Sequence, residues 1–248
     1  MDTINTVAHK ARLLALVLPF VLGACGGGAA TDTPVAPVAP VAQLQAGTWV
    51  VMGSSTAAGA GAPAGKGWVA LVGAAYAARG VQVANIAQGG TVTYEGLSAS
   101  TAPVASRPAP NPALNIDQAL SRKPVLLILA YPGNDTAHNY GPDETVNNLL
   151  TIRSQALAAG VPVVVTSSQP RNLSDAQLTQ LRAIDARLSA NVGPCFVEVR
   201  AALAGPDGRL APAYDSGDGV HPNEAGHEQI SLAVRNTLDS GRCIKLPN

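Results

Sequence analysis

Short apolar runs alternate with longer segments of helical periodicity from residue 47 to the end of the chain. The run Val125–Leu129 contains no polar residue, which is typical of a strand covered on both faces. Five residues before Gly80 share one helical face: Trp68, Leu71, Val72, Ala75 and Tyr76. Glycine ends helices readily, so the pattern predicts a helix that stops at this position.

The same patterns place elements along the whole segment. We expect strands at 48–52, 81–87, 124–130, 161–166 and 196–199. We expect helices at 68–79, 144–159 and 175–190, and a last helix starting at Pro222, because proline is favoured in the first helical turn. Regular alternation of strand and helix predicts a flavodoxin-like, three-layer α/β/α sandwich around a parallel sheet of about five strands.

Polar and glycine-rich clusters follow several of the predicted strands. They lie at residues 53–56, 85–91, 132–135 and 218–222. Ligands of parallel α/β sheets bind beyond the carboxyl ends of the strands, so these clusters are where we expect the chemistry.

The amino-acid composition argues against some classes of function. Lys and Arg number 16, as do Asp and Glu, so the charges cancel and leave no basic face for nucleic acid. Hydrophobic residues make up 47% of the chain, but aromatic residues only 4%. No segment reaches the roughly 18 uninterrupted apolar residues of a spanning helix, so the apolar residues predict a globular core.

The amino terminus has the pattern of a signal peptide over residues 1–24. Lys10 and Arg12 precede an apolar run, which ends in Leu22-Gly23-Ala24-Cys25. These four residues resemble a bacterial lipobox, which implies diacylation of Cys25 and membrane contact through the lipid only. Gly26, rather than an aspartate, follows this cysteine; in a lipoprotein of a Gram-negative host this implies sorting to the outer membrane of the cell envelope, facing the periplasm or the surface. The alternative is ordinary secretion, with Cys25 an unused thiol.

Residues 25–46 are predicted to form a tether, because glycines are followed by spaced prolines that favour an extended chain. The folded domain is then residues 47–248. Lipidation of Cys25 would leave Cys195 and Cys243, an even pair that favours a disulfide in an oxidising compartment. Two buried free thiols are the alternative.

Taken in order, the four clusters resemble the motifs of the SGNH or GDSL hydrolase family. The resemblance spans residues 48–235 and implies a Ser-His-Asp triad that cleaves carboxylic esters through an acyl-enzyme. The correspondence selects Ser55 as nucleophile, His221 as general base and Asp218 as the acid that orients it. A serine hydroxyl needs such a base, and the base needs a carboxylate to fix its tautomer. No cofactor or metal is implied.

A second Asp-x-x-His stands at Asp135 and His138, and spacing alone does not choose between the two pairs. The resemblance favours His221, because it follows the last strand with Pro222 behind it. It makes Asp135 a structural residue and His138 a pocket-wall or surface residue. His227 is expected on the solvent face of the last helix.

For the oxyanion hole, the resemblance implies the Ser55 N–H, the Gly90 N–H and the Asn134 side-chain amide. Gly89 competes with Gly90 for this place. The chain departs from the family at two points: Ser54 replaces the aspartate of the name-giving motif, and Pro132 shifts the glycine before Asn134 by one position.

The substrate is less well defined by the sequence. Four tyrosines lie near proposed site residues and are candidates to line a pocket for a sugar or an acyl chain: Tyr94, Tyr131, Tyr140 and Tyr214. We therefore expect a serine hydrolase acting on an acyl ester of a small molecule, carbohydrate or lipid. The alternative is a noncatalytic envelope lipoprotein of the same fold that binds glycan or protein partners.

Overall fold

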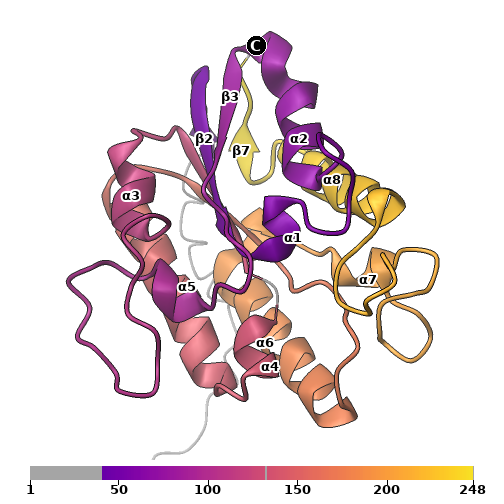
Figure 1. The fold of residues 1–248 in the computed structure, drawn as a ribbon. Helices are drawn as coiled ribbons and strands as arrows, with labels where there is room; N and C mark the ends of the chain where they lie inside the picture. Colours follow the sequence, from indigo (N-terminus) through magenta and orange to yellow (C-terminus); the bar gives the residue numbers. More distant parts are fainter. Residues whose placement is uncertain (1–40, 132, 248) are drawn as a thin grey trace, which may run out of the picture. The chain divides into compact units, whose positions relative to one another are not determined.

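The computed structural model describes residues 41–131 and 133–247. Its main sheet has five parallel strands in the order β3-β2-β4-β5-β6 (Figure 1). The strands are β2 (Gly47–Gly53), β3 (Val81–Asn85), β4 (Leu126–Ala130), β5 (Val163–Thr166) and β6 (Phe196–Val197). Helices cover both faces, which confirms the predicted three-layer α/β/α sandwich.

Side chains of β2 alternate between two cores, because successive residues of a strand point to opposite faces. Trp49 and Val51 contact one core, whereas Val50 and Met52 contact the other. All residues of β4 are buried, which accounts for a sequence without polar alternation.

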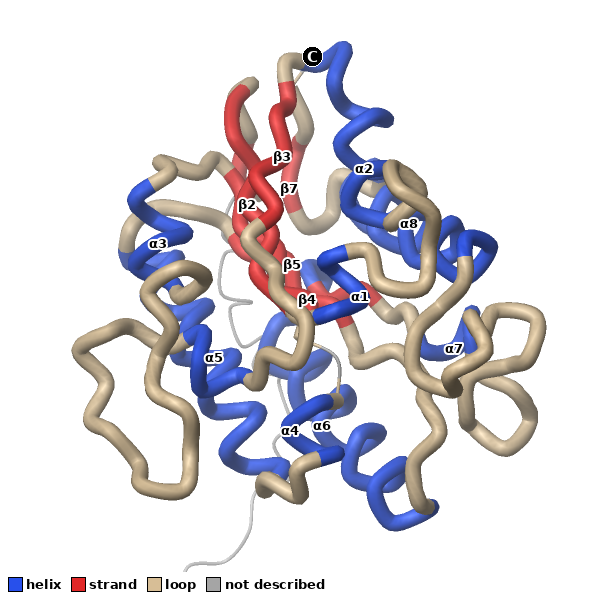
Figure 2. Tube along the Cα trace, in the orientation of Figure 1, coloured by secondary structure: helices blue, strands red, loops and turns tan. Residues whose placement is uncertain are grey.

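The helices divide between the two faces, as Figures 1 and 2 show. One face is covered by α1 (Ser55–Ala58), α2 (Trp68–Tyr76), α7 (Arg200–Leu203) and α8 (Glu224–Asp239). The other is covered by α3 (Ile116–Ser121), α5 (Pro142–Ala158) and α6 (Asp175–Val192). The short α4 (Asn134–Ala137) follows β4, and 3₁₀ turns lie at Ala77–Arg79, Thr93–Gly96 and Gly193–Cys195.

Two predicted helices differ from the structure in detail. In α2, Val69 is buried, whereas Leu71 is only partly buried and Ala75 is exposed, so the face against the sheet is rotated from the expected one. The predicted start at Pro222 is wrong, because α8 begins at Glu224. Asn223 caps it by accepting a hydrogen bond from the N–H of Gly226 at 3.0 Å.

The amino-terminal end of the described chain pairs with the carboxyl terminus. β1 (Ala42–Gln43) runs parallel to β7 (Ile244–Lys245), and Leu44 is buried in the core. The folded part therefore begins before residue 47, where the sequence placed its boundary. The predicted signal peptide and Cys25 lie outside the described residues.

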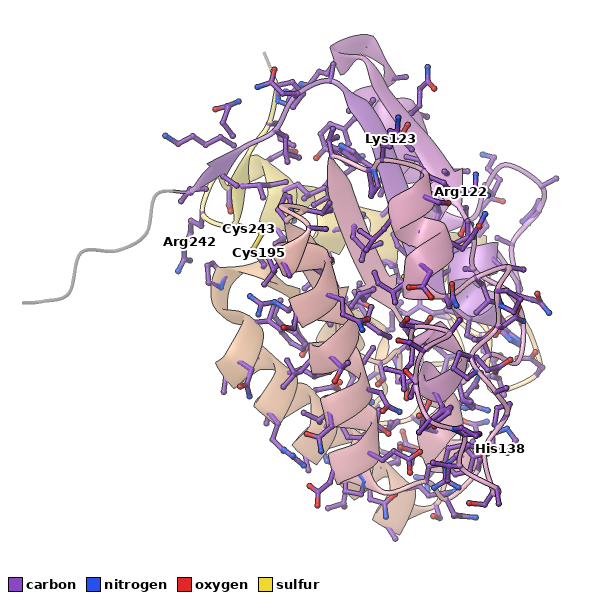
Figure 3. The ribbon with its side chains drawn as sticks, turned by 90° about the vertical axis from the view of Figure 1, so that its left-hand side faces the viewer. Arg122, Lys123, His138, Cys195, Arg242 and Cys243 are labelled. Carbon is purple, nitrogen blue, oxygen red and sulfur yellow. A yellow bond between two sulfur atoms is a disulfide. The ribbon has the colours of Figure 1, made fainter. Side chains whose placement is uncertain are left out.

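Cys195 and Cys243 form a disulfide bond, with their Cα atoms 4.7 Å apart (Figure 3). The bond joins the amino end of β6 to the segment before β7. It is the pairing expected from the sequence. Of the helices in the described ranges, none has the length and apolarity needed to cross a bilayer.

Candidate active site

Ser55 is the first residue of α1, which follows the end of β2 after one intervening residue. Just before Ser55, β2 approaches β4 closely: a Cβ on Gly53 would lie 2.3 Å from the carbonyl oxygen of Ala130. Glycine allows this close approach of two strands. From the neighbouring strand, Asn85 donates a hydrogen bond of 2.7 Å to the carbonyl of Ala57 and holds α1 in place.

Hydrogen bonds join Ser55, His221 and Asp218 in a chain. The Ser55 Oγ lies 2.8 Å from the His221 Nε2, and the His221 Nδ1 lies 2.6 Å from the Asp218 Oδ2. An ionised carboxylate only accepts hydrogen bonds, so the Nδ1 proton faces Asp218 and Nε2 accepts from the serine hydroxyl. The structure thus brings together three residues from opposite ends of the domain.

The Asp218 carboxylate is held in its charged form. Desolvation raises its pKa, but hydrogen bonds from the backbone N–H and side chain of His221 and from the N–H of Val220 outweigh this effect. The pKa of Asp218 therefore lies well below its usual range. A fixed negative charge beside Nδ1 favours the cation that His221 becomes when it takes a proton.

The loop after β5 supports the loop that carries this pair. Gln169 donates from its side chain to the carbonyl of Val220 at 3.0 Å, and the N–H of Asn172 donates to the carbonyl of Gly219 at 2.7 Å. Neither residue belongs to the four sequence clusters. Their position after the fourth strand of the sheet is the only signal that marks them.

The Asn134 side chain lies beside the turn that carries Ser55. Its Nδ2 donates to the Ser54 Oγ at 2.8 Å and to the carbonyl of Thr91 at 3.0 Å. Its Oδ1 accepts from the Arg171 Nη1 at 2.9 Å. Ser54 is fully buried and so takes a structural position. Pro132 lies outside the described residues.

Gly89 and Gly90 form a turn beyond β3. A Cβ on Gly89 would lie 3.8 Å from the Cβ of Ser55. Gly90 has a φ of 82°, in the left-handed region where side chains are strained. Gly89 is thus the glycine whose side-chain position neighbours Ser55, whereas the space around the corresponding position of Gly90 is open.

The competing pair Asp135 and His138 is not joined. Asp135 is buried and accepts hydrogen bonds from the N–H and the hydroxyl of Thr93. Burial raises the pKa of Asp135. His138 is exposed and stacks on Tyr140, with ring centroids 5.6 Å apart; Figure 3 shows it near the end of the molecule away from Lys123.

His227 is fully buried, so its expected place on the solvent face is wrong. Its Nδ1 accepts from the N–H of Trp68 at 3.1 Å, and its Nε2 donates to the carbonyl of Ala60 at 2.9 Å. Both ends of the loop at 59–67 are thereby fixed to α8. A Cβ on Gly61 would lie 3.0 Å from the Cβ of His221, so this loop packs directly against the candidate base.

Two of the four tyrosines belong to the core rather than to an open pocket. Tyr94 and Tyr131 are buried, and the Tyr94 hydroxyl donates to the carbonyl of Ala102. Only Tyr140 and Tyr214 are partly exposed. The expected tyrosine-lined pocket is therefore reduced to these two candidates.

A parallel α/β/α sandwich in which hydrogen bonds join a serine, a histidine and an aspartate near the carboxyl end of β2 is the architecture expected of an SGNH hydrolase. A family model described as the GDSL-like lipase/acylhydrolase family matches residues 51–229. The chain belongs to this family and is a carboxylic ester hydrolase.

Known proteins are similar to this chain in sequence and in fold. Esterase TesA of Pseudomonas aeruginosa is 27% identical over 203 residues, covering 79% of this chain and 90% of the relative. The crystal structure of TesA is similar with a TM-score of 0.61 at 23% identity, covering 78% of this chain and 98% of that one. The esterase EstA of Pseudoalteromonas sp. is similar with a TM-score of 0.55 at 15% identity, covering 78% and 97%.

Proposed function

We propose that the protein cleaves carboxylic esters by a Ser-His-Asp triad formed by Ser55, His221 and Asp218. The His221 Nε2 takes the hydroxyl proton as the Ser55 Oγ attacks the carbonyl carbon. Asp218 stabilises the resulting imidazolium. Collapse of the tetrahedral intermediate gives an acyl-enzyme, and the imidazolium protonates the departing alcohol. A water molecule, activated by the same imidazole, then releases the acid.

The negative oxygen formed during attack requires donors that are already in place. We assign this role to the N–H of Ser55, the Asn134 amide and the N–H of Gly90. The motif spacing supports Gly90, whereas the place of Gly89 beside Ser55 makes its N–H the alternative. Loss of one such donor typically costs about 3 to 4 kcal/mol in the transition state. Asn134 uses both of its N–H groups in the free protein, so the oxyanion would take over one of them from Ser54 or Thr91.

The observation that carries this proposal is the 2.8 Å contact between the Ser55 Oγ and the His221 Nε2. The test is labelling with a fluorophosphonate probe, which reacts with activated serines. Wild type should be labelled and Ser55→Ala should not, whereas Ser54→Ala, its matched neighbour, should retain labelling. Labelling that survives Ser55→Ala, or no labelling of the wild type, would overturn the assignment.

For the substrate, we propose a short acyl ester of a polar alcohol. A groove of about 810 Å³ lies beside the Asp218 loop. Asn172 and Asp215 line it, and both bond to Gly219. Gln177, Asp207 and Arg209 line the groove beside apolar residues such as Leu173 and Leu210, and the polar members support binding of a hydroxyl-bearing alcohol. Hydrolysis of acetylated sugars and of p-nitrophenyl acetate should exceed that of p-nitrophenyl palmitate; the reverse order would favour lipids.

We also propose that the mature protein begins at a lipidated Cys25 in the cell envelope. The lipobox-like residues 22–25 support this assignment. Labelling with radioactive palmitate in cells should be lost in Cys25→Ser. Equal labelling of both forms would contradict it.

A further inference from the structure

Arg171 lies between the two halves of the candidate site. It belongs to the loop after β5, and its Nη1 donates to the Asn134 Oδ1 at 2.9 Å. Gln169 and Asn172 of the same loop bond to the carbonyls of Val220 and Gly219. One short loop therefore connects the candidate oxyanion side chain with the loop that carries Asp218 and His221.

The charge of Arg171 is unusually placed. Its guanidinium is partly buried, and the Nε is fully enclosed with no hydrogen-bond partner. Among the ion pairs of the described chain, none includes Arg171. Burial lowers its pKa, and the negative charge of Asp218 offsets part of this effect. Burying a cation without a carboxylate partner costs stability, so the position calls for another explanation.

The contact with Asn134 gives that explanation. A side-chain amide has an oxygen and a nitrogen of nearly equal size, and only its partners decide which way it points. Arg171 carries donors and no acceptor, so it can bond to Asn134 only when the Oδ1 of the amide faces it. The Nδ2 then faces the other way, toward Ser54 and Thr91 beside Ser55. The positive charge also polarises the amide and makes its N–H groups stronger donors.

We infer that Arg171 is a positioning residue, which fixes and polarises the Asn134 amide for oxyanion binding. The inference rests on the proposed function, because it needs Asn134 to act in the transition state. In this role Arg171 acts through Asn134 and does not itself contact the substrate. The loss caused by removing Arg171 should therefore depend on the presence of Asn134.

The test is a double-mutant cycle with Arg171→Met, Asn134→Ala and the double variant, using p-nitrophenyl acetate. Arg171→Met should lower kcat about 10- to 100-fold with KM changed less than about threefold, as expected for an interaction realised in the transition state. In the Asn134→Ala background, the same substitution should lower kcat by less than about threefold. Arg171→Lys should restore part of kcat, because it keeps a charged donor.

Two controls separate this role from a merely structural one. Arg122→Met removes an exposed arginine (Figure 3) that precedes the amino end of β4, whereas Ser55 follows the carboxyl end of the neighbouring β2, and should leave kcat and KM unchanged. Thermal unfolding should show that the Arg171 variants are folded at the assay temperature. Fluorophosphonate labelling gives the fraction of molecules with a reactive serine in each sample, and kcat is calculated per labelled molecule.

The outcomes are distinct. An inactive, unlabelled wild type would overturn the proposed function itself and this inference with it. An active wild type with an equally active Arg171→Met would overturn only the role of Arg171. Losses that multiply fully in the double variant would also overturn it, because Arg171 would then act independently of Asn134. A rise in KM without a fall in kcat would assign Arg171 to ground-state substrate binding instead.

Discussion

Ser54 and Ser55 are adjacent in sequence but have different environments. Ser54 is the last residue before α1, is fully buried, and accepts a hydrogen bond from Asn134. Ser55 begins α1, is partly exposed and contacts His221. The difference arises because the chain turns from strand to helix between them, so their side chains leave the backbone in different directions. Sequence position alone gives two candidates, and the turn distinguishes them.

The two Asp-x-x-His pairs make opposite predictions when their histidines are removed. His221→Ala should lower kcat/KM for p-nitrophenyl acetate by at least about 10³-fold, since the Ser55 hydroxyl would lose its proton acceptor. His138→Ala, the matched control, should stay within about twofold, because His138 is exposed and contacts Tyr140 rather than Asp135. Steady-state kinetics with both variants decide the matter. A large loss in His138→Ala with an active His221→Ala would reverse the assignment.

The glycine pair offers a second test at the level of single residues. Gly90→Ala should destabilise the turn by roughly 1 to 2 kcal/mol, because its φ of 82° strains any side chain. Gly89→Ala adds a methyl group at ordinary contact distance from Ser55, so its effect should fall on kcat/KM more than on stability. Urea unfolding and ester hydrolysis of both variants separate these effects. A strongly destabilised Gly89→Ala would contradict the geometry.

At the scale of elements, the strands were predictable because an uninterrupted apolar run and its flanking turns are local signals. β4 is the clearest case. The end of a helix depends on side-chain contacts as well, so Pro222 was a misleading start and Asn223 the true cap. Short helices such as α1 and α4 have too few residues to show a period.

The supporting contacts of the site had no local signal. The motif residues Ser55, Asp218 and His221 could be proposed from the sequence because their types and order carry the chemistry. Arg171 and His227 could not, since their roles come from what packs against them after folding. A histidine on an amphipathic helix gives no indication of which face it occupies until the neighbouring loop is in place.

The free energy of unfolding should depend on pH through His227, whose neutral ring bonds to both ends of the loop at 59–67. Burial lowers the pKa of His227 below its ordinary value of 6.5. The unfolded chain therefore binds a proton at a higher pH than the folded protein does. Stability from this group is complete above pH 6.5 and is lost as the pH falls from there toward the folded-state pKa. Protonation would place an N–H at Nδ1, against the N–H of Trp68.

His227→Gln is the matched variant for this prediction. Glutamine offers an acceptor oxygen for the N–H of Trp68 and a donor NH2 group for the carbonyl of Ala60, and it does not titrate. Urea unfolding between pH 5 and 8 should show a smaller decrease in stability at acid pH for the variant than for wild type. Identical pH profiles would show that another group is responsible; His221 and His138 remain in both proteins as internal controls.

At the scale of the whole described domain, the candidate active site and the disulfide bond lie at opposite ends of the sheet. Ser55 follows the carboxyl end of β2, whereas the disulfide lies before the amino end of β6. The segment after Cys243 forms β7, which pairs with β1 where the described chain begins. The disulfide therefore fixes both termini of the domain without touching the candidate site, and stability and catalysis should be separable.

Replacing both cysteines, Cys195→Ser and Cys243→Ser, tests that separation. The bond closes a loop across a sequence separation of 48 residues, for which chain entropy predicts a stabilisation of about 4 kcal/mol. Urea unfolding should show a decrease of up to this size, and dithiothreitol should weaken wild type but not the variant. Because the bond lies at the amino end of the sheet, kcat/KM at low temperature should stay within about twofold of wild type. A large fall in kcat/KM in a sample that is still folded would contradict this separation, because it would show that the disulfide at one end of the sheet determines the geometry of the candidate active site at the other.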